Sequence, residues 1–581
     1  MKPSQVLEMK IKEQNIAYPR IKIVEFLEKN NGEHLDDTAI KYYGNNISYG
    51  RLFEEIDAYS RAFASFGVGE GDYVSVCLPS IPEALYIMYA LNKLGAVYHS
   101  VLPTASPEQV AGVLRANQAK VFVTLDSLYG RVGAAAAAVP VKVRVSANSS
   151  LPGGLKQLKY ARDAARGKFY GNIPKEYLSV SRFKKNGAGT EFTQSSWKEG
   201  SVAIITSSSG STATKNKATM LTDYGFNAMA TNYKIAFPQL HRGQTFHSCI
   251  PILYATGASN SVNLPLQLGF TTILEPVFNR DLYPSAFMSH KPNLSIVPPP
   301  HAKSLLNFLR KIYGEGNKNR ELLSFVDVYS VGGAHMPVPW ETELEDYLHY
   351  YGSSAAIGKG YGLSEHNSAL TGSLCRMIGA AGMVLPGVIM AVFDPVTGEE
   401  LDFGQEGQIR AISPADMSGY FAEEELTNEY FRRGSDGRKW GHTGDIGRLE
   451  LIDGEVWFFY SGREKDMVTV DGRNILLAKL QSKVFECGDI DDCEVVMVDL
   501  GGGPVPAAHI VLKSEIIKSE AVLEKLNAVF GESDIPEPFA YKIHKALPVL
   551  ISGKADKHTL LGDKTGYIKY TDGKIGYIMQ D

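Results

Sequence analysis

A run of hydroxyl side chains follows a short apolar segment near residue 205. The stretch ITSSSGSTATKNKATMLT, residues 205–222, holds nine serines and threonines, one glycine and two lysines. Hydroxyl and backbone N–H groups gathered in one loop suit phosphate oxygens, and a lysine adds positive charge. The loop is not a Walker A motif, because it lacks the GxxxxGK[ST] spacing. Such a segment is also typical of a solvated connection, so these residues alone leave both interpretations open.

Five further motifs with chemically useful side chains follow this loop. YSVGGAH ends a strand in two glycines, which admit a flat ligand close to the backbone. GYGLSEHN combines an aromatic ring, a hydroxyl and a carboxylate, GHTGDIG carries one aspartate, SGREKD one arginine, and LISGKADKHTL one lysine beside a glycine. Each motif alone has a plain explanation as a turn, a core tyrosine or a solvated charge. Their joint order and spacing are not expected of an unrelated α/β protein.

Together these motifs resemble the adenylate-forming superfamily: acyl-CoA synthetases, beetle luciferases and the adenylation domains of nonribosomal peptide synthetases. The resemblance runs from about Ile47, in ISYGRLFEE, to Leu560, and includes LPGVIMAVFDPVTGEELDFGQEGQIRA and MSGYF. It implies that ATP activates a carboxylic acid to acyl-AMP with release of pyrophosphate. It also implies transfer of the acyl group to the thiol of CoA or of a phosphopantetheine-bearing carrier protein.

The same resemblance assigns a part of ATP to each motif. The hydroxyl loop matches the family's phosphate loop, and its lysine is Lys217 or Lys215, with Lys217 favoured. The implied nucleotide contacts are Ser208, Ser209, Gly210, Ser211, Thr212 and Lys217 at the β- and γ-phosphates, Gly332, Gly333 and Ala334 beside adenine, Tyr361 and Gly362 on the adenine ring, Ser364 at the α-phosphate, and Asp445 with Arg463 at the ribose.

The implied catalytic groups are Lys554, Glu365 and Ser364. A carboxylate oxygen attacks the α-phosphorus, so two anions meet and negative charge builds up. Lys554 of the SGK motif bridges the substrate carboxylate and the α-phosphate, and Glu365 holds Mg²⁺, which prefers one carboxylate plus substrate phosphates. Neutralising groups where charge develops lower the barrier. The C-terminal domain is implied to rotate about Lys465, presenting either Lys554 or the loop around Gly472.

Two segments depart from the family pattern. Ala213 replaces a glycine of the phosphate loop, and the loop's proline is missing. In GRNILLAKLQ, Leu477 stands for the family's proline, and Lys479 and Gln481 stand for its two glutamates. These departures leave open an adenylating enzyme with an acceptor other than CoA, or a catalytically impaired nucleotide-binding homologue. Against impairment stand four functional side chains present together: Glu365, Asp445, Arg463 and Lys554.

The resemblance also places a substrate pocket around PILYATG, residues 251–257. Its implied lining is Tyr254, Ala255 and Gly257, with Gly333. Amino-acid-activating members carry an aspartate at the position of Ala255, where it pairs with the substrate ammonium. An unpaired buried ammonium is costly. We therefore expect an uncharged aliphatic or aromatic acid rather than an α-amino acid.

Alternating elements must position these side chains. Residues 72–79 and 119–125 are predicted as buried strands, and residues 81–97 as a helix between them, which is typical of α/β units with parallel strands. The weaker pattern of residues 131–198 is interpreted as surface elaboration. Around the DPVTG turn, residues 388–412 predict two strands of a small antiparallel sheet or barrel.

The expected fold class is α/β, with a large N-terminal domain and a small C-terminal one. The first, residues 1–462, holds two α/β subdomains and a β-barrel-like subdomain, and it binds ATP and the carboxylate. The second, residues 463–581, is a mobile α+β domain that carries the catalytic lysine. Its tail after residue 560 is predicted as a short β-hairpin.

Composition sets outer limits. A chain of 581 residues is too long for one hydrophobic core, so at least two domains are expected. The net charge of −5 indicates no attraction to nucleic acid or anionic lipid. Five scattered cysteines without CxxC spacing favour a reducing, cytoplasmic location and no structural zinc. No secretory signal and no apolar run long enough for a membrane span are expected.

Overall fold

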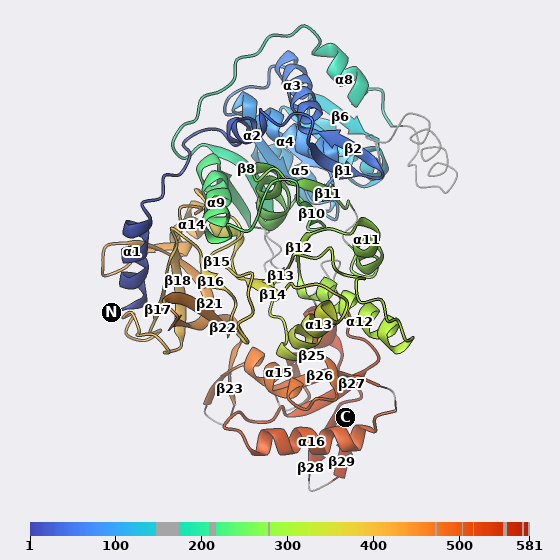
Figure 1. Cartoon of the computed structure of the whole chain (residues 1–581), viewed down its shortest axis with the longest axis vertical. Helices are drawn as coiled ribbons and strands as arrows, with labels where there is room; N and C mark the ends of the chain where they lie inside the picture. The colour runs from blue at the N-terminus through green and yellow to red at the C-terminus, as the bar shows by residue number, and fades with distance from the viewer. Residues whose placement is uncertain are drawn as a thin grey trace.

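The computed structural model describes most of the chain. The described residues are 1–146, 173–207, 217–276, 279–470, 473–501, 503–514, 516–549, 555–571 and 574–578. Figure 1 shows an elongated molecule with most of its N-terminal third at one end, its C-terminal residues at the other, and helix α1 (Pro3–Gln14) with the N-terminus between them. No helix within these ranges is long and apolar enough to cross a membrane.

An eight-stranded, mostly parallel sheet forms the N-terminal end of the molecule. Its strand order is β19-β9-β8-β4-β3-β5-β6-β7. Helix α4 is predicted within residues 81–97 and runs from Pro82 to Leu94; it starts with proline in its first turn and ends at Gly95, whose φ is 74°. The predicted strands are confirmed as β3 and β5, which pair in parallel. The central strands are β3 (Tyr73–Cys77), β4 (Val97–Ser100), β5 (Val121–Leu125) and β8 (Val202–Ser207).

The prediction of mere surface elaboration for residues 131–198 is wrong in part. Two further parallel strands, β6 (Val141–Val145) and β7 (Tyr177–Ser179), extend the sheet beyond β5, and helix α8 (Val180–Asn186) follows them. In β6 the charged residues Lys142 and Arg144 interrupt the apolar run. Long cationic side chains bury their stems beside a core while the charge stays near water, so a real strand looks polar in sequence.

A second, seven-stranded sheet carries the middle of the chain, in the order β14-β13-β12-β10-β11-β1-β2. Its register aligns Phe246 with Leu294, and Leu294 with Val328, so these three side chains share one face. The next row, His247, Ser295 and Tyr329, faces the other way. The strands that matter for the site are β10 (Thr245–Ser248), β12 (Leu294–Val297), β13 (Val328–Gly332) and β14 (Ile357–Gly360).

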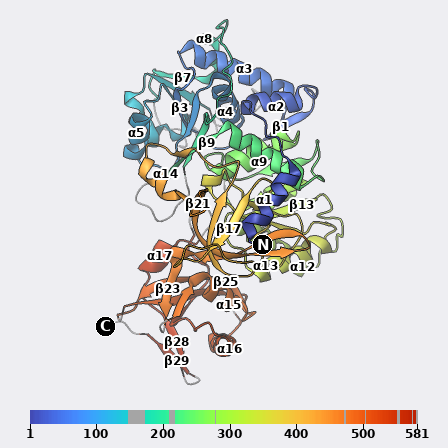
Figure 2. The same cartoon turned by 90° about the vertical axis from the view of Figure 1, so that its left-hand side faces the viewer.

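A third sheet is antiparallel and lies between the two ends of the molecule. The two predicted strands around the DPVTG turn are confirmed as β17 (Ile389–Phe393) and β18 (Gly407–Ile412). They continue through β21 (Lys439–Ile452) to β22 (Glu455–Arg463). Helix α1 (Pro3–Gln14) lies beside this sheet (Figure 2), and Ser4 bonds to Glu400.

The C-terminal residues form a separate five-stranded sheet, β25-β26-β27-β28-β29. The predicted tail hairpin is confirmed as β28 (Ile568–Thr571) and β29 (Lys574–Tyr577). The first strand, β25 (Ile490–Asp499), also docks this unit onto helix α12 (Pro299–Gly314), because the Asp491 carboxylate accepts from Lys303 at 2.5 Å and from Arg310 at 2.7 Å. Rotation of residues 463–581 as a mobile domain stays a prediction.

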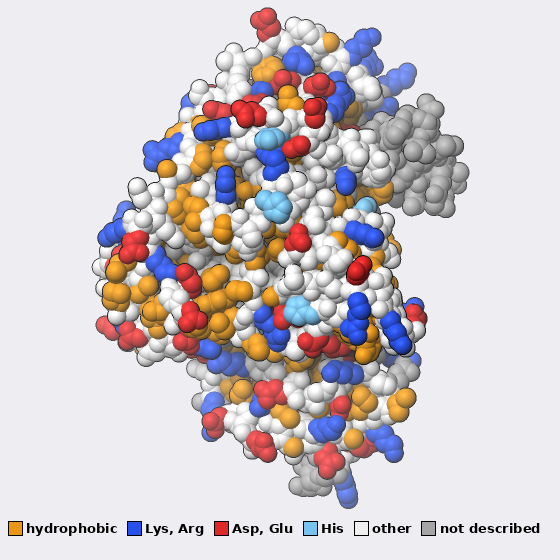
Figure 3. Space-filling view, viewed as in Figure 1, with side chains coloured by type: hydrophobic (Ala, Val, Ile, Leu, Met, Phe, Trp, Pro, Cys, Tyr) orange, Lys and Arg blue, Asp and Glu red, His pale blue; other side chains and the backbone are white. Residues whose placement is uncertain are grey.

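The surface carries charges of both signs. On the face shown in Figure 3, acidic and basic side chains are interspersed with apolar ones, without a large field of one sign.

Candidate active site

The predicted phosphate loop connects two antiparallel strands. Strand β8 ends at Ser207, which pairs with Ala218 at the start of β9 (Ala218–Thr222). Residues 208–216 lie outside the described residues, and with them Ser208, Ser209, Gly210, Ser211, Thr212 and the alternative lysine Lys215. Lys217 is described, and its ammonium lies 5.0 Å from the ring centroid of Tyr420.

Tyr420 joins this lysine to the predicted metal-binding carboxylate. Its hydroxyl donates to Glu365 Oε1 at 2.6 Å, and burial beside this carboxylate raises the pKa of Tyr420. Tyr420 lies on strand β19 (Gly419–Tyr420), which pairs with β9. After strands β17 and β18 of the third sheet, the chain therefore returns to the edge of the first sheet. The structure therefore brings Lys217 and Glu365 to one place. Sequence reasoning noted MSGYF only as a typical segment and missed this contact.

Glu365 sits in the single turn η4 (Ser364–His366) that follows β14. The backbone N–H of Met417 donates to its carbonyl at 2.8 Å. Ser364 opens the same turn and is half-buried. The next side chain, His366, is buried and contacts Asp416 and Tyr430. None of these three contacts was predicted from the sequence.

A tyrosine and an arginine converge on the predicted ribose-binding aspartate. The Tyr361 hydroxyl donates to Asp445 Oδ2 at 2.7 Å, and Arg463 Nε lies 3.2 Å from Oδ1. Asp445 on β21 and Arg463 on β22 are direct partners in the antiparallel register. Asp445 is 1% exposed and Arg463 50% exposed. Burial raises the pKa of Asp445, and the Arg463 charge opposes that shift.

The phenol ring of Tyr361 packs on the third sheet. Its centroid lies 4.6 Å from that of Phe458 and 6.1 Å from that of Tyr460. Its backbone N–H donates to Thr371 at 2.9 Å, which fixes the start of the loop after β14. Tyr361, Asp445 and Arg463, predicted from three separate motifs, thus form one contiguous group.

Glycines let two backbone segments approach each other beside this group. Gly333 has a φ of 82°, which disfavours other residues, and it directly follows β13. A Cβ atom at Gly362 would lie 1.9 Å from the carbonyl oxygen of Ser368. Ala334 is exposed next to Gly333. The backbone at Gly333 and Ala334, just after β13, is exposed and has open space beside it, so a ligand can approach it there.

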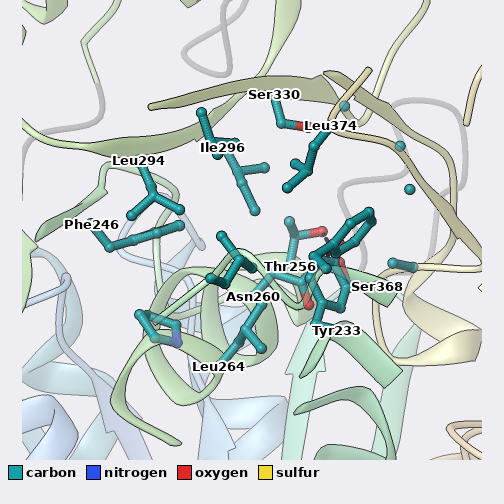
Figure 4. Close-up of a pocket in the computed structure, with 18 of the residues that line it drawn as sticks. Tyr233, Phe246, Thr256, Asn260, Leu264, Leu294, Ile296, Ser330, Ser368 and Leu374 are labelled. Carbon is teal, nitrogen blue, oxygen red and sulfur yellow. Dashed lines mark hydrogen bonds between the residues drawn. The ribbon is translucent and has the colours of Figure 1, made fainter. Parts of the chain in front are cut away.

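An apolar cavity of about 860 Å³, counting its open mouth, lies on the Phe246–Leu294–Val328 face of the second sheet (Figure 4). Gly332, Gly333, Tyr361 and Gly362 line it, so it is continuous with the group just described. Among the described residues that line it, none is Asp, Glu, Lys, Arg or His. Its apolar wall is built from Phe237, Leu240, Phe246, Ile250, Leu264, Leu268, Phe270, Leu294, Ile296, Val328 and Leu374.

The predicted pocket residues are placed unevenly around this cavity. Gly333 lines it, but Tyr254, Ala255 and Gly257 do not; Thr256, between them, does. Ala255 and Gly257 are buried, and a Cβ at Gly257 would lie 1.8 Å from the carbonyl oxygen of Pro251. The segment predicted from the sequence thus borders the cavity, while most of the wall comes from residues that sequence reasoning did not select.

The predicted catalytic lysine lies outside the described residues. Residues 550–554, including Lys554, are flanked by a bridge between Val549 and Ala555. Lys465, the predicted hinge, is exposed in the turn η5 (Glu464–Asp466). Lys479 forms an ion pair with Glu406 at 2.7 Å across to the third sheet.

The sequence is similar to a known protein family and to named proteins along most of its length. The model of a family described as "AMP-binding enzyme" matches residues 27–421. The chain is 24% identical over 554 residues to a long-chain-fatty-acid–CoA ligase of Bacillus subtilis, covering 91% of this chain and 92% of that protein. It is 26% identical over 539 residues to 4-coumarate–CoA ligase 1 of Arabidopsis thaliana, covering 84% of this chain and 86% of that protein.

Solved structures share the fold. An anthranilate CoA ligase in complex with anthranoyl-AMP superposes with a TM-score of 0.77 at 17% identity, covering 94% of this chain and 98% of that one. A benzoate CoA ligase from Burkholderia xenovorans gives a TM-score of 0.74 at 17% identity, covering 93% and 99%.

Proposed function

The chain belongs to the AMP-binding enzyme family, and from this premise we propose that it is an AMP-forming acid–thiol ligase. It activates a carboxylic acid with ATP, releases pyrophosphate and transfers the acyl group to CoA. One observation carries the proposal: Tyr361, which bonds to Asp445 beside Arg463, lines an apolar cavity that lacks charged lining residues among those described. A nucleotide and an apolar acid can therefore meet at one point.

The nucleoside end uses the buried aspartate. Asp445 accepts hydrogen bonds from the ribose hydroxyls, which replace its present contact with the Tyr361 hydroxyl. Tyr361 is then released to stack on adenine beside Gly332 and Gly333. A carboxylate held in a buried, prearranged place contributes positioning.

The phosphate end uses Lys217 and Glu365, which Tyr420 connects. The hydroxyl loop, residues 208–216, adds donors to the β- and γ-phosphates. Tyr420 donates to only one oxygen of Glu365, and a carboxylate oxygen beside phosphates fits the hard-ligand preference of Mg²⁺. When bound, Mg²⁺ supplies charge neutralisation at the phosphates; Glu365 holds it, and Tyr420 orients Glu365.

In the first half-reaction, an oxygen of the substrate carboxylate forms a bond to the α-phosphorus. The bond from the α-phosphorus to the bridging oxygen of pyrophosphate breaks, and pyrophosphate leaves with the electron pair. Lys554 bridges the carboxylate and the α-phosphate, and Ser364 contacts the α-phosphate. Removal of such a charge-stabilising group typically costs about 3–4 kcal/mol of transition-state stabilisation.

The cavity supports an uncharged acyl group. An ammonium or second carboxylate buried among Phe246, Leu294 and Val328 would have no partner. Relatives named for long-chain fatty acids and for 4-coumarate point the same way. We therefore propose an aliphatic or aromatic monocarboxylic acid as the substrate.

CoA is the favoured acceptor, because the relatives from Bacillus subtilis and Arabidopsis thaliana are named as CoA ligases. A different acceptor, such as a carrier-protein thiol, is the second candidate. It rests on Lys479 and Gln481, which replace family glutamates and are engaged elsewhere: Lys479 with Glu406, and Gln481 with the carbonyl of Cys493 at 2.5 Å. All five cysteines are free, which supports a reducing, cytoplasmic setting.

Mass spectrometry of the products tests the proposal. The purified chain, ATP, Mg²⁺ and a panel of monocarboxylic acids should yield acyl-AMP without CoA and acyl-CoA with it. Acyl-AMP that persists in the presence of CoA would favour the other acceptor. Absence of both products across the panel would contradict the enzyme assignment.

A further inference from the structure

A buried histidine directly follows the proposed metal-binding glutamate. His366 is 0% exposed, and each ring nitrogen has a partner: Nδ1 lies 2.5 Å from Asp416 Oδ1, and Nε2 lies 2.8 Å from the Tyr430 hydroxyl. With its proton on Nδ1, the ring donates to the carboxylate and accepts from the phenol, so every polar atom is satisfied. We call His366, Asp416 and Tyr430 the clamp.

The clamp also ties this turn to the third sheet. The His366 ring packs on the backbone of Gly441 in β21, where a Cβ atom would lie 2.8 Å from His366 Cε1. The same strand carries Asp445 four residues later. A displacement of His366 therefore shifts the Glu365 turn relative to the ribose site.

The turn itself holds strained backbone. Asn367 has a φ of 50° and Ser368 a φ of 97°, two successive left-handed positions without a glycine. Such residues cost about 1–3 kcal/mol each and persist where the surroundings over-determine them. Within the turn, the N–H groups of His366 and Ser368 donate to the carbonyl of Leu363, and the N–H of Asn367 donates to the carbonyl of Ser364. The clamp adds support from outside the turn, together with the Met417 N–H and with Thr256, which accepts from the Ser368 hydroxyl at 3.1 Å.

The short segment of residues 416–420 contacts both Glu365 and His366. Asp416 binds the His366 ring, Met417 N–H donates to the Glu365 carbonyl at 2.8 Å, and the Tyr420 hydroxyl donates to the Glu365 carboxylate at 2.6 Å. Glu365 and His366 thus point to different partners on the same segment. The position of the Glu365 carboxylate is coupled to the seating of His366.

We propose that His366, held by Asp416 and Tyr430, is a positioning residue that fixes the Glu365 carboxylate at the phosphate site. The inference rests on the proposed function of Glu365. Supporting residues around a metal ligand typically affect metal affinity or activity by about 10–100-fold when they are lost. Loss of the clamp lets the strained turn relax, so Glu365 leaves its place while the nucleoside group at Tyr361 and Asp445 stays intact.

Calorimetric titration tests this separation. ATP is titrated into the full chain with Mg²⁺ and, separately, with EDTA; AMP is titrated as a ligand that needs no γ-phosphate site. Asp416→Ala removes the carboxylate that binds His366, and Asp416→Asn retains an acceptor for Nδ1–H. Tyr430→Phe removes only the hydroxyl at Nε2 and is used if the alanine variant fails to fold. The matched control is Asp436→Ala, which removes a carboxylate that accepts from Trp440 Nε1 at 3.0 Å and is not a partner of the His366 ring.

We expect Asp416→Ala to weaken ATP binding with Mg²⁺ by about 10–100-fold, with AMP binding unchanged. Asp416→Asn should restore most of the affinity, and Asp436→Ala should behave as the wild type. Equal losses for AMP and for ATP with Mg²⁺ would show a merely structural role and overturn the inference, as would an Asp416→Ala protein with full Mg²⁺ dependence. A wild-type chain that binds no ATP at all would instead contradict the proposed function.

Discussion

Replacing Asp445 with asparagine tests the nucleoside end of the site. The substitution keeps the size of the side chain but removes its charge and one acceptor oxygen. Asp445 is 1% exposed, so a ribose bound there meets little competing water. A hydrogen bond to a charged group contributes about 1.5–3 kcal/mol, which corresponds to about 10–150-fold in affinity. We therefore expect the KM for ATP to rise by about that factor, with a smaller change in kcat.

The assay is a double-mutant cycle between protein and substrate. Wild type and Asp445→Asn are compared with ATP, 2′-deoxy-ATP and 3′-deoxy-ATP. The wild type should lose affinity for each deoxy analogue, and the variant should lose little further affinity, because the partner is already gone. Asp436→Asn, at the turn before the same strand, serves as control. Equal losses for wild type and variant would refute the contact between Asp445 and the ribose.

Three other expectations follow from the described contacts. Burial lowers the pKa of His247 to about 3. The stability that depends on its neutral ring is therefore complete above the unfolded pKa of about 6.5 and is lost as the pH falls from there towards 3. In chemical denaturation, His247→Phe should reduce the slope of the unfolding free energy against pH in this range by about 1.4 kcal/mol per pH unit. Asp491→Ala should loosen docking of the C-terminal sheet and raise the radius of gyration in solution scattering, whereas Asp489→Ala, whose carboxylate pairs with a lysine of the same unit, should not. Val328→Phe should narrow the cavity and lower kcat/KM for the largest accepted acid by at least about tenfold while smaller acids remain substrates.

Much of the fold follows from local patterns in the sequence. Strands β3 and β5, helix α4, the β17–β18 pair and the tail hairpin all match predicted segments, because apolar periodicity and turn residues are local signals. The segment with β6 was misinterpreted, because Lys142 and Arg144 mask an otherwise buried strand. The pairing of β6 with β5 and β7 is a tertiary feature, which local polarity does not reveal.

The site was predictable where motifs carry it. Tyr361, Asp445 and Arg463 come together as expected from three motifs. The cavity wall was not, because Phe246, Leu294 and Val328 lie on separate strands and share a face only through the parallel register. The contacts of His366 with Asp416, 50 residues away, have no local signal at all.

Acid-dependent exchange of labelled pyrophosphate into ATP measures the adenylation step itself. We predict exchange with at least one uncharged monocarboxylic acid in the presence of Mg²⁺, and a loss of about 100-fold or more in Lys554→Ala, by the magnitude typical of a lost charge-stabilising group. An unchanged exchange rate in Lys554→Ala, or no exchange with any acid of a broad panel, would contradict the account.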